Sequence, residues 1–257
     1  MNRGMNWHGV AAIYRFEMAR ARRTLWQSLV APVITTALYF VVFGSALGSR
    51  MSAMDGVGFG SFIVPGLTLL SVFMQSIFNA SFGIYFPKFS GTIYELLSAP
   101  ISSLETVLAY VGAAATKSLV LALVTLATAT FFVSVRVDHP FAMIGFLVAI
   151  CTAFCLLGFV IGIWAQSFEQ LQIVPMLVVT PLTFLGGAFY SVTTLAEPWR
   201  TVTLFNPVVY LVSGFRWAFY GRADVPVWAS VAVLAAIIML TLAAITWIFR
   251  TGYRLKR

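Results

Sequence analysis

Six runs of predominantly apolar residues, each about 20 residues long or longer, determine what this chain can fold into. A helix needs about 20 apolar residues to cross the hydrocarbon core of a bilayer, where every backbone polar group must be satisfied within the segment. Charged residues make up only 9% of the 257 residues, too few to cover a soluble protein of this size. The sequence therefore predicts an all-α polytopic helical membrane protein, with a transmembrane domain over residues 28–250. The six predicted spans are residues 28–47, 59–85, 106–133, 141–165, 171–189 and 227–249.

The formal net charge of +8 is concentrated near the two ends of the chain. With six spans both ends lie on one side, and basic residues in short flanks favour the cytoplasm. We therefore expect cytoplasmic termini, with residues 251–257 as a basic tail. Residues 1–27 combine arginines with an apolar stripe that includes Trp7, Tyr14 and Met18, which is typical of a helix lying in the membrane interface. The basic excess then contacts anionic lipid of the bilayer, and no nucleic acid is expected as a partner.

The polar link Lys88–Ser102, between the second and third spans, predicts a short amphipathic helix over about residues 88–99. Ile93, Leu96 and Leu97 form its apolar stripe, and Pro100 ends it because proline has no N–H donor. A helix of this kind on the membrane surface suits docking onto a soluble partner; the alternative is that it merely covers a gap between helices. The residues assigned to docking are Thr92, Tyr94, Glu95, Ser98 and Pro100.

Residues 191–222 are too polar to span the membrane and too apolar for a free loop. Pro198 and Pro207 stand where helices can begin, and Asn206 can cap the second helix. An external, re-entrant pair of short helices would bury the apolar residues under protein; an amphipathic surface loop is the alternative. The candidate residues of this element are Glu197, Arg200, Asn206, Pro207, Tyr210 and Arg216.

Three polar residues within the spans are candidates for a translocation path. Lys117 is a full charge inside an apolar run, and such charges are functional candidates by default, although its long side chain can also snorkel to the interface. Gln75 and Asn79 share one face of the second span and would either line the path or form hydrogen bonds between helices.

The small residues and cysteines of the spans point to packing. Gly158 and Gly162 allow close helix approach, either inside one subunit or across a dimer interface, and Gly44-x-x-x-Gly48 gives the same signal. Cys151 and Cys155, one helical turn apart, have poor geometry for a disulfide and are expected in the core.

No catalytic or metal-binding set is apparent in the sequence. His8 and His139 are expected on opposite sides of the membrane. The string Gly112–Ser118 lacks the glycines of a phosphate-binding loop, so no ATP site and no enzymatic activity of its own are expected.

The chain resembles the membrane subunits of type-2 ABC transporters, the ABC-2 permeases, over nearly its whole length. Residues 94–102, YELLSAPIS, are similar to that family's E-L-L-x-x-P-(I/L)-S signature. Asn206, Pro207, Tyr210, Gly214 and Arg216 are similar to its N-P-x-x-Y-x-x-x-G-x-R signature.

The resemblance implies a permease of the bacterial inner membrane, similar to exporters of polysaccharides, lipooligosaccharides and drugs. It implies a coupling helix at residues 88–99, a second copy of the permease as a homodimer, and two ATPase subunits that carry ATP and Mg²⁺. Outward transport follows from the resemblance alone.

The cargo expected from the residues is amphipathic, lipid-linked or hydrophobic, because a hydrated ion would lose its water without replacement ligands along such apolar spans. Trp199, Phe205, Phe215 and Trp217 would stack on a departing sugar or ring, or form an interfacial aromatic belt. The rival classes are an ion-coupled secondary transporter, for which coupling carboxylates within the spans are missing, and a membrane assembly subunit that transports nothing.

Overall fold

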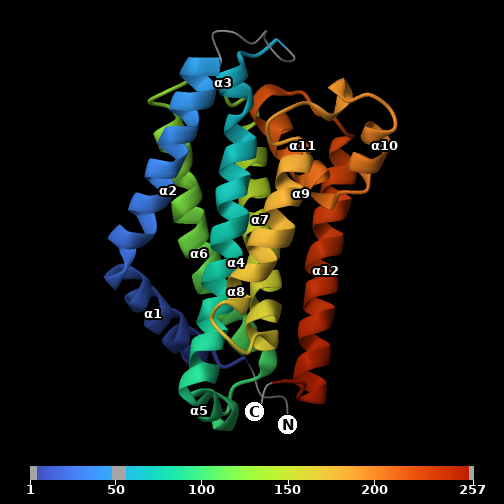
Figure 1. The fold of residues 1–257 in the computed structure, drawn as a ribbon. Helices are drawn as coiled ribbons and strands as arrows, with labels where there is room; N and C mark the ends of the chain where they lie inside the picture. The colour runs from blue at the N-terminus through green and yellow to red at the C-terminus, as the bar shows by residue number, and fades with distance from the viewer. Residues whose placement is uncertain (1–4, 48–55, 255–257) are drawn as a thin grey trace.

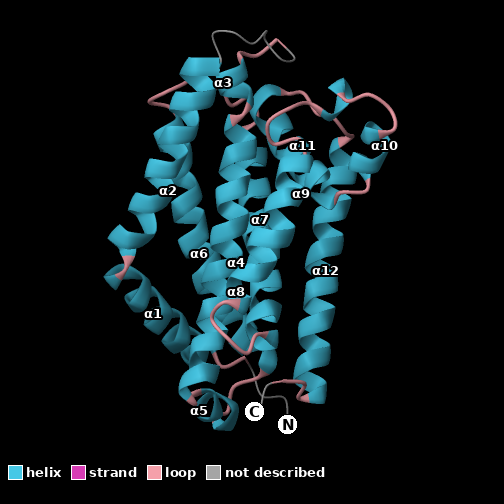
Figure 2. Cartoon of the chain, in the orientation of Figure 1, coloured by secondary structure: helices cyan, strands magenta, loops and turns pink. Residues whose placement is uncertain are grey.

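The computed structural model describes residues 5–47 and 56–254. Within these ranges every secondary-structure element is a helix (Figure 2). The α-helices are α1 (Trp7–Arg23), α2 (Leu25–Tyr39), α3 (Phe59–Phe62), α4 (Val64–Ser90), α5 (Ile93–Ser98), α6 (Ser103–Ala129), α7 (Pro140–Trp164), α8 (Gln170–Val174), α9 (Thr180–Leu185), α10 (Trp199–Leu204), α11 (Pro207–Tyr220) and α12 (Val227–Thr251). Two π-helical segments, η1 (Phe40–Leu47) and η2 (Pro175–Val179), and a 3₁₀ turn, η3 (Val192–Thr194), continue or connect them.

Five helical stretches in the described ranges are long and apolar enough to cross a membrane: Leu25–Phe43, Phe59–Ser90, Ser103–Ala129, Pro140–Trp164 and Val227–Thr251. They correspond to five of the six predicted spans and confirm a polytopic helical membrane protein. The predicted fifth span, residues 171–189, is a shorter apolar helical stretch, Gln170–Leu185, formed by α8, η2 and α9. Whether this shorter segment crosses the membrane stays a prediction.

The helices form one bundle in which α4 packs against α6 and α7 (Figure 1). Gly158 and Gly162 of α7 lie on the backbone of α4, so close that an added Cβ would collide with the carbonyl oxygens of Ile77 and Ser81. The paired glycines therefore pack helices inside one subunit, the first of the two interpretations above. The second pair lies partly outside the described residues, at Gly48.

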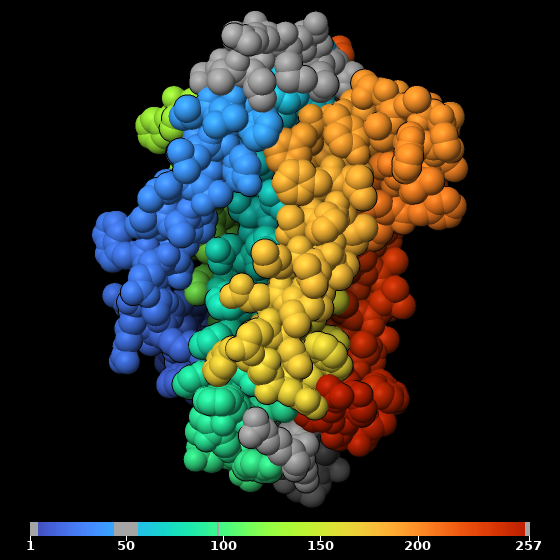
Figure 3. Space-filling model, viewed as in Figure 1, coloured from blue at the N-terminus to red at the C-terminus, as the bar shows by residue number. Residues whose placement is uncertain are grey.

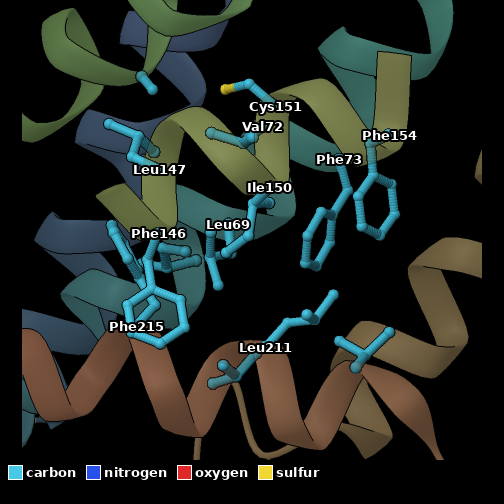
Figure 4. Packing of buried hydrophobic residues seen from close by; sticks show 14 of the residues in the cluster. Leu69, Val72, Phe73, Phe146, Leu147, Ile150, Cys151, Phe154, Leu211 and Phe215 are labelled. Carbon is cyan, nitrogen blue, oxygen red and sulfur yellow. The ribbon is translucent and has the colours of Figure 1, made fainter. Parts of the chain in front are cut away.

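The core of the bundle is filled by aromatic and branched side chains from α4, α7 and α11 (Figure 4). Phe73 and Phe154 stack with their ring centroids 4.1 Å apart. Cys151 and Cys155 are free thiols that are 1% and 0% exposed, which confirms that they pack in the core.

The boundaries of the polar link differ from the prediction. Lys88 belongs to the last turn of α4, and Gly91, whose φ of +83° is left-handed, ends that helix. The amphipathic helix is therefore the six-residue α5, shorter than the predicted 88–99. As predicted, it stops before Pro100, where Ala99 turns to an extended conformation because proline disfavours the helical one before it.

The start of α1 and the end of α12 lie at the α5 end of the bundle (Figure 1). This is the arrangement expected for an even number of passes. Of the predicted interfacial segment 1–27 and basic tail 251–257, residues 1–4 and 255–257 lie outside the described ranges.

Candidate functional site

A groove runs along one face of α4, between α1 and α2 on one side and α8 and α9 on the other. Figure 3 shows this face of the molecule, with α4 between those two walls. Three cavities of about 260, 360 and 350 Å³ make up the groove. The first two share Phe78, Asn79 and Lys117, and the last two share Met74 and Gln75, so the cavities adjoin one another. We call this feature the α4 groove.

The α4 groove brings together the three polar residues that the sequence singled out within the spans. Gln75 and Asn79 of α4 and Lys117 of α6 all line its middle cavity. The side-chain amide of Asn79 also donates to the Ser118 hydroxyl over 3.3 Å. Asn79 therefore forms a hydrogen bond between α4 and α6 and also lines the groove, whereas its place in a translocation path stays a prediction.

Two charged residues of α1, Glu17 and Arg20, also line the groove, and the sequence interpretation missed both. The guanidinium of Arg20 pairs with Glu17 Oε2 over 2.5 Å and lies 5.3 Å from the centroid of the Phe82 ring. The arginines of residues 1–27 were expected to contact lipid in the membrane interface, and no coupling carboxylate was expected within the spans. Glu17 follows Tyr14 by three residues, which is a signal that it lies within the apolar stripe.

Burial of Glu17 has an electrostatic consequence. It raises the pKa of the Glu17 carboxyl above its usual value, against the opposing effects of the Arg20 and Lys117 charges. Its Oε1 atom is buried without a hydrogen-bond partner among the described residues.

The α5 end of the bundle carries the predicted docking residues, and Thr92, Tyr94, Glu95, Ser98 and Pro100 are all exposed there. Ile93 of the apolar stripe is only 3% exposed and packs into the helix bundle rather than facing a membrane. The side chain of Leu97 lies outside what the structure describes.

Hydrogen bonds tie this end to the rest of the bundle. The Glu105 carboxylate caps α6 by accepting from the Ser102 backbone N–H over 2.7 Å, and it also accepts from the Asn6 backbone N–H at the start of α1. Lys88 Nζ donates to the carbonyl oxygens of Ile163 and Ala165 at the end of α7, over 2.6 and 3.1 Å. These bonds join the segments that flank α5, the end of α4 and the start of α6, to the start of α1 and the end of α7.

At the opposite end, the predicted helical pair is α10 and α11 (Figure 1). Asn206 caps α11 as expected, accepting from the Val208 N–H over 3.0 Å, and its amide donates to the Leu182 carbonyl over 2.6 Å. Pro207 is the first residue of α11, and the Tyr210 hydroxyl donates to the Leu204 carbonyl over 3.1 Å. These contacts hold α11 against its neighbours, so it is a packed helix rather than a surface loop.

Arg216 anchors the same corner from inside. Its guanidinium donates to Asp224 Oδ2 over 3.0 Å and to the Gly187 carbonyl over 2.5 Å, and lies 4.0 Å from the centroid of the Phe62 ring. Glu197 and Arg200, by contrast, are exposed.

The four outer aromatic residues do not form one surface. Phe215 is fully buried in the core, so it cannot stack on a cargo, which contradicts that expectation. Trp217 is half-buried and stacks on His139 at 4.5 Å between ring centroids. Trp199 and Phe205 are exposed.

Comparisons with known proteins give one family. The family model described as ABC-2 type transporter matches residues 8–220. The chain is 38% identical to the inner membrane transport permease YadH of Escherichia coli (strain K12), with 91% of each chain covered. It is 23% identical to nodulation protein J of Rhizobium leguminosarum bv. viciae, over 96% of this chain and 95% of the relative. It is 24% identical to nodulation protein J of Rhizobium meliloti (strain 1021), over 83% and 80%.

Proposed function

From the premise that this chain belongs to the ABC-2 type transporter family, as a transport permease that works with an ABC ATPase subunit, we propose that it serves an ATP-driven exporter. The proposed cargo is amphipathic or lipid-linked. The permease supplies the membrane path, and the ATPase subunit supplies hydrolysis of ATP. The name of the Escherichia coli relative places that protein in the inner membrane, and we propose the same location here, with both termini and α5 cytoplasmic.

The observation that carries this proposal is the α4 groove. It joins polar side chains to an apolar bundle surface along the direction of the helices. An amphipathic cargo can keep its apolar part in the bilayer while its polar part passes Gln75 and Asn79. A hydrated ion would lose its water shell and find few replacement ligands, which is costly.

We propose that two copies of the permease face each other across their grooves, each with one ATPase subunit. The groove is open along one side of a single chain, and α2, which borders it, leaves Trp26, Ile34 and Leu38 exposed. A second copy would close the groove into a path, and the exposed α5 residues would meet the ATPase subunits.

The groove is tested in the complete complex with its ATPase, reconstituted in liposomes. Glycolipids, hydrophobic drugs and small ions are screened for stimulation of ATP hydrolysis and for uptake into inverted vesicles. We expect Gln75→Trp, which fills the groove, to abolish amphiphile uptake. Met239→Trp introduces the same ring on α12, at a residue that is 67% exposed, and should leave uptake unchanged. Stimulation and uptake confined to small hydrophilic ions would overturn the proposal.

The coupling role of α5 is tested by charge reversal at its exposed acid. We expect Glu95→Arg to reduce uptake about tenfold or more and to weaken co-purification of the ATPase subunit, because like or unpaired charge at an interface is costly. Glu197→Arg makes the same change at the opposite end of the bundle and should have no effect. Equal uptake by the Glu95→Arg and Glu197→Arg variants would contradict a role of α5 in coupling.

A further inference from the structure

Lys117 occupies a junction between cavities of different character. It lines the first and middle cavities of the α4 groove, and it also lines a smaller cavity of about 80 Å³ between α6 and the corner where α1 meets α2. Lys117 lies fourteen residues after Ser103, the first residue of α6, and therefore about 21 Å along that helix. Lys117 is thus attached near the middle of the 27-residue α6 rather than at its end.

The charges around this junction do not cancel. Arg20 is already paired with Glu17, whereas Lys117 forms no ion pair and no hydrogen bond with any residue that the structure describes. A cation that faces apolar walls is costly unless an anion or hydrogen-bond acceptors approach it. With Glu17, Arg20 and Lys117 all ionised, the first cavity has one positive charge in excess and attracts one anionic group.

The size and lining of the first cavity suit such a group. Its volume of about 260 Å³ is many times the space of about 10–15 Å³ that one water molecule needs. Asn79 and Tyr110 add polar atoms beside the three charged side chains of the lining. Gly83 has no side chain, so α4 leaves room where Glu17 and Arg20 approach it. A phosphate or carboxylate group would meet Lys117 and Arg20 as donors.

The neighbouring small cavity distinguishes an amphiphile from a free anion. Apart from Arg22, Ser28 and Lys117 its lining is apolar, formed by Met18, Ala21, Leu25, Leu29, Val120 and Leu121. Polar and apolar spaces thus meet at one side chain, as they do at the boundary between a lipid headgroup and its acyl chain.

We propose that the first cavity binds the anionic headgroup, a phosphate or carboxylate, of a lipid amphiphile whose chain lies along the apolar cavity beside α6. The inference rests on the proposed function, because it names the charged class of amphiphile that enters the α4 groove, with Lys117 as its principal contact.

Binding is measured on the full-length permease with its ATPase subunit, without ATP, in neutral detergent micelles. The probe is a fluorescent phosphatidylglycerol analogue, and phosphatidylcholine and inorganic phosphate serve as competitors. We expect Lys117→Gln to weaken binding about tenfold, the loss typical of one charge-assisted hydrogen bond, and Lys117→Arg to retain it. Arg15→Gln removes one exposed positive charge of α1 outside the cavity and should change affinity less than about twofold.

Each contrary outcome is distinct. Unchanged binding in Lys117→Gln, or an equal loss in Arg15→Gln, would overturn the site, as would equal competition by phosphatidylcholine. Displacement of the lipid by millimolar inorganic phosphate would assign the cavity to a free anion and overturn the lipid source. Lost binding with normal uptake of amphiphiles refutes this site alone, whereas retained binding in a complex that exports no amphiphile refutes the proposed function.

Discussion

At the scale of single residues, the polar side chains buried in this bundle have two different tasks. Arg216 is 3% exposed and is used by its own subunit, through Asp224 and Gly187, to hold α11 in place. Lys117 and Glu17 face the α4 groove instead. The signature residue Arg216 is therefore structural within the subunit, and the groove residues are those expected to meet a ligand.

Removal of the Arg216 charge should strongly destabilise the fold. Arg216→Leu leaves the buried Asp224 carboxylate without its cation, which typically costs about 3–5 kcal/mol. Arg200→Leu changes an exposed arginine of the neighbouring α10 and should cost less than about 0.5 kcal/mol. Denaturation in detergent, followed by tryptophan fluorescence, measures both. Equal losses in the two variants would contradict the anchoring role, and Asp224→Asn should recover part of the loss in Arg216→Leu.

The raised pKa of Glu17 predicts a dependence of stability on pH. A carboxyl group with a higher pKa in the folded state binds its proton more tightly there, so the fold loses stability as pH rises from about 4.5 through the folded pKa. Glu17→Gln stays neutral and should therefore gain in melting temperature over the wild type as pH rises through that window. Melting curves between pH 4 and 8 measure the gap, with the exposed Glu197→Gln as control. A gap that shrinks with rising pH would contradict this prediction.

At the scale of elements, the helices are placed by backbone proximity as much as by apolar contact. The α4–α7 pair packs closely because Gly158 and Gly162 have no side chains to separate the helices. The capping contacts of Glu105 and Lys88 then fix the ends of α1, α6 and α7 around α5. The structure thus has a closely packed central pair, α4 and α7, and α5 lies between segments that are hydrogen-bonded to the neighbouring helix ends.

Two glycine substitutions in α7 should separate packing from helix propensity. Gly158→Ala would place its Cβ against the Ile77 carbonyl, and overpacking of this kind costs about 1–3 kcal/mol. Gly145→Ala meets nothing within 4 Å and should instead stabilise the helix by about 0.5–1 kcal/mol. Thermal unfolding of the two purified variants makes the comparison. A Gly158→Ala variant as stable as Gly145→Ala would mean that α4 and α7 are not in backbone contact.

At the scale of the whole molecule, the two ends of the bundle differ in what they expose. The α5 end presents the polar residues Thr92, Glu95 and Ser98 together with the Tyr94 ring, whereas the opposite end presents α10 with Trp199 and Phe205 exposed. The α4 groove lies along the bundle between these ends. The α5 end, the α4 groove and the α10 end are thus arranged along one axis, in the order expected if α5 docks the ATPase subunit and the cargo passes along the groove.

Cysteine labelling can measure which end of the bundle, the α5 end or the α10 end, faces the cytoplasm. In a Cys151→Ala, Cys155→Ala background, Arg200→Cys and Ser98→Cys place single thiols at exposed positions at opposite ends. A membrane-impermeant thiol reagent should label Arg200→Cys in intact cells, and Ser98→Cys only after permeabilisation. The reverse pattern would refute cytoplasmic placement of α5.

Local features were predictable from the sequence because they depend on neighbours in the chain. Apolar run length located five long helices, proline ended α5, and Asn206 capped α11. The polar residues Gln75, Asn79 and Lys117 were also recognisable, because polar groups stand out within apolar runs. The predicted length of α5 was wrong because α4 continues to Ser90, beyond the predicted end of the span at residue 85, before the left-handed Gly91 ends it.

Only the tertiary structure decided which of these residues meet. Glu17 and Arg20 face Lys117 because α1 packs against α6, and no local pattern encodes that contact between distant segments. Phe215 is buried and Phe205 exposed although both are aromatic residues of one short region, because α11 packs among α4, α7 and α12 while α10 does not. The sequence by itself determined that the chain forms apolar helices and where most of them begin and end, since backbone hydrogen bonding and apolarity act locally. Which faces pack, and therefore where the α4 groove lies, depends on steric fit between helices and was decided by the fold.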